Sequence, residues 1–68
     1  MTTVINHVRE FRYDKGLTQL QLSRLADITP ASVCNIELQD RPTPKIDTCL
    51  RLARALGTTV DELFELHK

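Results

Sequence analysis

Four residues within a segment of six have side chains that could contact the edges of DNA bases: Pro30, Ala31, Ser32 and Asn35. An asparagine amide donates and accepts at once, and it can pair bidentately with adenine in the major groove of DNA. Pro30 and Ala31 offer apolar surface suited to a thymine methyl, and Ser32 discriminates poorly between bases. Because no arginine stands among them to read guanine, the pattern predicts a target with A·T pairs, recognised partly through DNA shape. Plain helix surface is the alternative interpretation for Ala31 and Ser32.

Two helix starts, eleven residues apart, would position this group. Thr18 and Thr29 are good N-caps, and each stands between two apolar residues that form a hydrophobic staple. The staple pairs are Leu17 with Leu22 and Ile28 with Val33. Gln21 completes a capping box with Thr18, Pro30 suits the first helical position, and Asp27 occupies the turn. Two short helices joined in this way predict a helix-turn-helix, whose second helix usually enters the major groove.

Three further helices are expected around this pair, and no strand. They run from about residue 3 to Tyr13, from about Pro44 to Leu56, and onward from Thr59, with Gly16 and Gly57 as stop signals. Helical spacing predicts sixteen core positions: Val4, Val8, Phe11, Leu22, Leu25, Ala26, Val33, Ile36, Ile46, Cys49, Leu50, Ala53, Leu56, Val60, Leu63 and Phe64. The sequence therefore predicts an all-α fold of five helices in a single domain over residues 1–68.

Composition restricts the function classes. The net charge is zero and the pI is 6.7, which weighs against DNA binding because phosphate contacts usually need a basic surface. The sequence has no Gly-rich phosphate loop and no recognisable nucleophile–base pair, so we expect no enzyme and no cofactor. Cys34 and Cys49 are expected to be reduced, small buried hydrophobes, and the two histidines lie far apart, so no metal site is expected.

No apolar run is long enough to span a bilayer and no signal peptide is visible, so a soluble cytoplasmic protein is expected.

Several short motifs, in order, resemble one known family. They are residues 8–12 (VREFR), 15–19 (KGLTQ), Leu22, Ile28-Thr29, Val33, Ile36-Glu37, residues 52–57 (LARALG) and residues 60–64 (VDELF). With this set the chain resembles the Cro/C1-type (xenobiotic-response-element, XRE) helix-turn-helix domain of phage and bacterial repressors, from Val8 to Phe64. The resemblance implies a lambda-repressor-like fold and sequence-specific binding of double-stranded DNA. Ser23, Asp27, Gln39 and Lys45 depart from the family pattern.

The resemblance also implies roles for single residues. Gln19 stands where the family grips the DNA backbone, and the helix start favours an anion there; the alternative is an exposed helix-start residue. Arg12 and Glu37 match a partly buried salt bridge with a structural role. DNA-contacting residues are then expected at Gln19, Thr29, Pro30, Ala31, Ser32, Asn35, Arg41, Thr43 and Lys45. Arg41, Thr43 and Lys45 would reach phosphates from the loop and the next helix start, unless they are ordinary loop residues.

Oligomeric state follows from the expected target. Proteins of this kind read two-fold sites as dimers with half-sites about one helical turn apart, so a homodimeric transcriptional regulator that acts as a repressor is the leading hypothesis. Phe64 and Leu66 on the last helix are the candidate dimer interface. The alternative is a protein-interaction module or an antitoxin-like partner protein with weak or no DNA binding. Affinity for duplex DNA and its salt dependence would distinguish the two.

Overall fold

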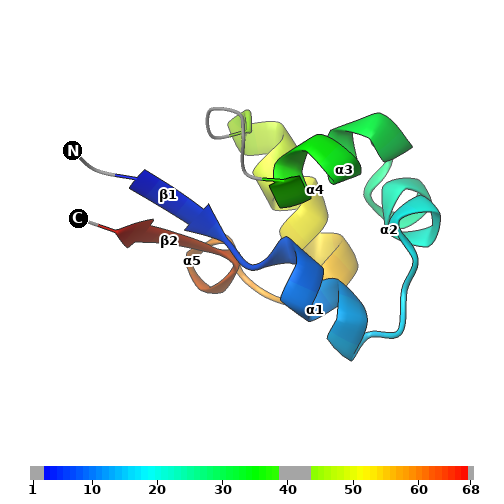
Figure 1. The fold of residues 1–68 in the computed structure, drawn as a ribbon, viewed down its shortest axis with the longest axis horizontal. Coiled ribbons are helices and arrows are strands. Elements are labelled where there is room, and N and C mark those ends of the chain that lie inside the picture. The colour runs from blue at the N-terminus through cyan, green and yellow to red at the C-terminus, as the bar shows by residue number, and fades with distance from the viewer. Residues whose placement is uncertain (1–2, 39–43, 68) are drawn as a thin grey trace.

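The helix boundaries follow the capping signals of the sequence. A computed structural model describes residues 3–38 and 44–67. Within them it has five helices and a two-stranded antiparallel sheet (Figure 1). The order is β1 (Thr3–Asn6), α1 (Val8–Asp14), α2 (Gln19–Ala26), α3 (Pro30–Leu38), α4 (Ile46–Leu56), α5 (Val60–Leu63) and β2 (Phe64–His67). The all-α class with a helix-turn-helix at the second and third helices is confirmed.

Caps and turns explain where α2 begins and ends. Thr18 Oγ1 accepts from the Gln21 backbone N–H at 3.1 Å, and the Gln21 side chain accepts from the Thr18 N–H at 2.8 Å. This is the reciprocal capping box that the sequence predicts. Asp27 ends α2 with φ of 57°, a left-handed conformation that aspartate tolerates better than most non-glycine residues. Gly57 ends α4 in the same way, with φ of 68°.

The core lies where α1, α2, α4 and α5 meet, with α3 closing one side. Its buried members are Val8, Leu22, Ala26, Val33, Leu52, Ala53, Leu56 and Leu63. Three of the predicted core positions are wrong: Leu25, Ile46 and Leu50 are 61%, 68% and 54% exposed. In α2 the buried positions are Leu22, Ser23 and Ala26. At 100° per residue their centre lies about 110° from Leu25, so Leu25 faces solvent.

The expectation of no strand is also wrong. Residues 3–6 form β1 rather than the first turn of a helix, and residues 64–67 form β2 rather than the end of α5. The two strands pair antiparallel, with Val4 opposite Leu66 and Asn6 opposite Phe64. Thr, Val and Ile in succession favour extended backbone. The partner strand lies at the other end of the chain, where a local hydrophobic period cannot reveal it.

His7 joins the sheet to the helices. Its backbone N–H donates to the Leu63 carbonyl at 2.8 Å. Its ring bonds Glu10 through Nδ1 at 3.2 Å and Glu65 through Nε2 at 3.1 Å. These two hydrogen bonds raise the pKa of His7 above its ordinary value of 6.5, against a smaller effect of burial. The imidazolium therefore links the start of α1 to β2.

This link predicts a pH-dependent stability. Because the folded pKa of His7 is the higher one, its contribution is complete below the unfolded pKa, about 6.5, and is lost as pH rises through the folded pKa. We expect the thermal midpoint of the wild type, relative to His7→Gln, to be higher near pH 6 than near pH 8.5. Asp61→Asn, which changes a carboxylate on α5, should behave as wild type. An identical pH dependence in wild type and His7→Gln would contradict the assignment.

Candidate nucleic-acid interface

The helix-turn-helix pair is held at its turn and at both helix starts. Ile28 N–H donates to the Ser23 carbonyl at 2.9 Å, which closes the turn behind α2. At the start of α3, Thr29 Oγ1 accepts from the Ser32 backbone N–H at 3.1 Å, the N-cap bond that the sequence predicts. Ile28 packs against the core and Val33 is fully buried. Both helices therefore enter the fold at angles set by local contacts.

Arg51 of α4 adds a contact that sequence reasoning missed. Its Nη1 donates to the Asp27 carbonyl and to Asp27 Oδ2, both at 3.0 Å. Both side chains are exposed, so the charge pair itself contributes little. The bond to the carbonyl nevertheless ties the left-handed turn to α4. Helical spacing on α4 gives no sign of this partner, because the two residues lie 24 positions apart.

The outer surface of α3 carries the predicted group of contact residues. Pro30 and Ala31 are exposed, while Ser32 and Asn35 are half-buried. The Ser32 hydroxyl lies 2.8 Å from Thr29 Oγ1, so part of its hydrogen-bonding capacity is used within the helix start. Asn35 is therefore the residue of this surface with the largest capacity for a bidentate contact.

The last turn of α3 carries a buried carboxylate, that of Glu37. The side chain of Glu37 is 0% exposed, and Arg12 of α1 is only 8% exposed. Arg12 Nε donates to Glu37 Oε2 at 2.7 Å and Arg12 Nη2 donates to Oε1 at 3.0 Å, a bidentate arrangement. Arg12 Nη1 also donates to the Leu17 carbonyl at 2.9 Å. The structure thus brings Arg12 and Glu37 together and fixes α1 against α3.

Gln19 and Arg9 also approach the Glu37 carboxylate, and together with Arg12 the four side chains form one cluster. Gln19 Nε2 donates to Glu37 Oε1 at 3.2 Å, and Arg9 Nε lies 3.5 Å from the same oxygen. Burial disfavours the charged form of Glu37, but the hydrogen bonds from Arg12 and Gln19 outweigh it and hold the pKa of Glu37 below its ordinary value of 4.5. Arg9 was missed from the sequence, although it stands one turn before Arg12 on the same helix.

The remaining predicted site residues lie apart from this surface or outside the described residues. Lys45 is exposed at the N-cap position of α4, with no side-chain cap bond. Arg41 and Thr43 fall outside the described residues. Cys49 is buried as predicted, whereas Cys34 is half-buried.

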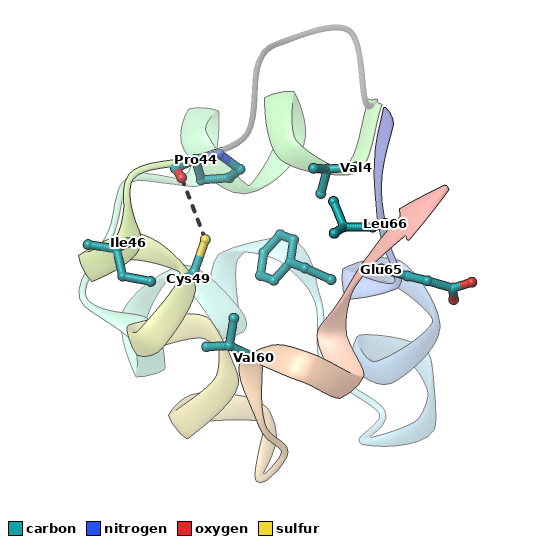
Figure 2. A pocket seen from close by; sticks show the side chains of 8 residues that line it. Val4, Pro44, Ile46, Cys49, Val60, Glu65 and Leu66 are labelled. Carbon is teal, nitrogen blue, oxygen red and sulfur yellow. Dashed lines mark hydrogen bonds between the residues drawn. The ribbon is translucent and has the colours of Figure 1, made fainter. Parts of the chain in front are cut away.

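Phe64 and Leu66 lie on β2, beside an apolar groove. The groove has a volume of about 230 Å³, and Figure 2 shows side chains of β1, α4, α5 and β2 around it. It is lined by Val4, Pro44, Ile46, Cys49, Val60, Phe64, Glu65 and Leu66. Leu66 and Ile46 are 67% and 68% exposed, so the groove opens onto apolar surface. Figure 1 shows the sheet at the opposite end of the molecule from α2.

Two further observations concern the described part of the chain. There, no group of three His, Cys, Asp or Glu side chains is arranged to hold a metal ion. Within the same residues, no helix is both long and apolar enough to cross a bilayer.

Comparisons with known proteins agree with this geometry. A helix-turn-helix family, HTH_3, matches residues 8–63. Among solved structures, one described as a SinR protein/SinI protein complex is similar, with a TM-score of 0.78 and 20% sequence identity. The match covers 81% of this chain and 53% of that chain, so this chain spans about half the length of that relative. At this identity the likeness concerns the fold. No curated protein matches the chain in sequence.

Proposed function

Because the chain belongs to the Cro/C1-type helix-turn-helix family of DNA-binding transcription regulators, we propose that it is a homodimeric repressor of a two-fold operator. The observation that carries this proposal is the outer surface of α3. That surface presents short apolar and amide side chains on a helix held firmly by α2 and by the Arg12–Glu37 pair. A helix of this kind fits the major groove without bulky or charged side chains that would hold it away.

Backbone contacts would orient the protein on the duplex. Gln19 lies at the start of α2, where unpaired N–H groups favour a phosphate. Lys45 is exposed at the start of α4 and would contact the backbone beside α3. Thr29 is exposed at the N-terminus of α3, and Arg41 and Thr43 are assigned to the same role from the sequence. These contacts supply affinity and register, whereas base contacts supply specificity.

Base recognition would rest mainly on Asn35. Its amide is suited to adenine N6 and N7, and Pro30 and Ala31 would meet a thymine methyl. Ser32 already bonds Thr29, so it would contribute less. We therefore expect half-sites with A·T pairs at their centre.

Dimerisation would use the apolar groove. A single copy of this small domain contacts too few bases for high affinity, and a two-fold operator calls for a two-fold protein. Exposed Leu66 and Ile46 at the groove, together with Phe64, supply the apolar area that such an interface needs.

Selection from a random duplex library tests the proposal. At about 100 mM salt, where phosphate contacts still bind strongly, the wild type should enrich a two-fold site containing A·T pairs. Asn35→Ala should bind that site with a loss of about 1–3 kcal/mol and relaxed preference at one position. Asp61→Ala, a surface change on α5, should select the same site as the wild type. A folded wild type that enriches no sequence would contradict the proposal.

A protein-interaction module is the second candidate. It is favoured by the zero net charge and the exposed apolar groove, and the similar solved structure is described as a complex of two proteins. In that case the groove would bind a different protein and the duplex would be bound weakly. A steep loss of duplex affinity between about 50 and 200 mM salt would speak for the regulator, and no measurable affinity would speak for the module.

A further inference from the structure

Three N–H donors approach Glu37 Oε1, one more than the number of its lone pairs. Arg12 Nη2, Gln19 Nε2 and Arg9 Nε lie 3.0, 3.2 and 3.5 Å from this one oxygen. A carboxylate oxygen has two lone pairs, and the contact of Arg9 is the longest of the three. Arg9 is thus the donor that this carboxylate holds least firmly.

The charge of the cluster is also unbalanced. Arg12 alone neutralises Glu37, because its two hydrogen bonds are short and both side chains are buried. Arg9 brings a second positive charge to the same carboxylate, and its side chain is 53% exposed. The three groups together carry one net positive charge, which faces solvent through Arg9.

The excess charge lies beside the predicted backbone contact. Arg9 and Gln19 approach the same oxygen of Glu37, so their ends are close in space although they belong to α1 and α2. A guanidinium has four N–H donors besides the Nε hydrogen, and the Gln19 amide has a second hydrogen on Nε2. An anion at this point would receive charge from one side chain and a hydrogen bond from the other.

We propose that Arg9 and Gln19 form a two-point clamp for one DNA phosphate, in which Arg9 exchanges its weak contact with Glu37 for the phosphate. This inference rests on the proposed DNA binding and adds a contact on α1. Arg12 stays with Glu37 throughout, so the fold does not loosen when Arg9 turns outward. Glu37 holds both donors near the required position before DNA arrives.

The salt dependence of binding tests the clamp. Affinity is measured for a mixed-sequence duplex of about 30 base pairs, three helical turns, between about 50 and 200 mM salt. Arg9→Gln should reduce the slope of log K against log salt by about 0.9, the value for one lost phosphate contact, and lower affinity about tenfold near 100 mM. Arg9→Lys should keep most of the slope, because lysine also binds phosphate as a point charge.

Arg54→Gln is the matched control. It removes the same charge from the last turn of α4 and should leave the slope and the affinity within about twofold of wild type, well under the loss of one contact. Thermal unfolding should show that Arg9→Gln is as stable as wild type, because Arg12 still neutralises Glu37. Equal slopes for Arg9→Gln and Arg54→Gln would overturn the clamp and leave the regulator proposal standing. A wild type that does not bind duplex DNA would overturn both.

Discussion

Arg12→Ala is expected to destabilise the domain by about 3–5 kcal/mol, the range for removing one partner of a buried ion pair. The reason is the surroundings of Glu37, whose side chain is 0% exposed and takes two short hydrogen bonds from Arg12. Gln19 carries no charge and Arg9 lies 3.5 Å away, so neither replaces the lost guanidinium. Urea unfolding at pH 7 measures the loss, with Arg9→Ala as the matched variant that should change stability by less than about 1 kcal/mol.

Two further results separate this mechanism from a simple loss of packing. The deficit of Arg12→Ala should shrink as the pH falls from neutral, because burial without the Arg12 hydrogen bonds raises the pKa of Glu37, and the protonated side chain no longer leaves an unpaired buried charge. Arg12→Met combined with Glu37→Leu should recover most of the stability, since apolar pairs of similar volume often replace buried ion pairs without loss. A deficit that is constant with pH, or a double variant no better than Arg12→Ala, would contradict the argument.

Leu66→Asp is expected to convert the proposed dimer into a monomer and to lower affinity for a two-fold duplex by about 100-fold or more. Leu66 is 67% exposed beside the groove, and a charge there cannot be buried against a second copy without a large desolvation penalty. The affinity loss follows because two linked half-site contacts bind 10²–10⁴ times more tightly than one, roughly the gain from effective concentration. Sedimentation equilibrium measures the mass, and titration of two-fold and single half-site duplexes measures the affinity.

Ile46→Asp and Leu25→Asp make this experiment specific. Ile46 lines the same groove from α4, outside the strand pairing, so its variant should also be monomeric without disturbing the sheet. Leu25 is 61% exposed on α2, away from the groove, so Leu25→Asp should leave the mass of the protein in solution unchanged. If both groove variants remain dimeric, the interface lies elsewhere on the molecule.

Local signals in the sequence were sufficient for the helices and insufficient for the sheet. The caps at Thr18 and Thr59 and the left-handed turns at Asp27 and Gly57 depend on a few neighbouring residues, so the sequence could predict them. Pairing of β1 with β2 depends on residues about sixty positions apart, and Val4 happens to match the helical period of Val8.

The positions of exposed leucines required the packed structure. Apolar spacing predicts that Leu50 faces inward, but the buried positions of α4 are Cys49, Leu52, Ala53 and Leu56. Leu50 lies about 110° from the centre of that set, at 100° per residue. A domain of this size has more apolar helix positions than its core can accept, so the pattern alone overpredicts burial.

Part of the candidate site could be predicted from the sequence and part could not. Asn35 and Gln19 could be singled out because their chemistry and their place in the helix-turn-helix are visible in the sequence. The shared use of the Glu37 carboxylate by three side chains could not be predicted, because it depends on how α1 meets α2 and α3 in space. These side chains are Arg9, Arg12 and Gln19.

The position of β1 and β2 at opposite ends of the chain has a consequence for the order of folding. Val4 pairs with Leu66, sixty-two positions later, whereas the helices and caps form from near neighbours. Contacts between distant residues form slowly, because a long loop must close first. The sheet is therefore expected to form last, after the helices have packed. Since the groove needs Val4 and Leu66 side by side, a newly made chain offers no finished surface for assembly until folding is complete.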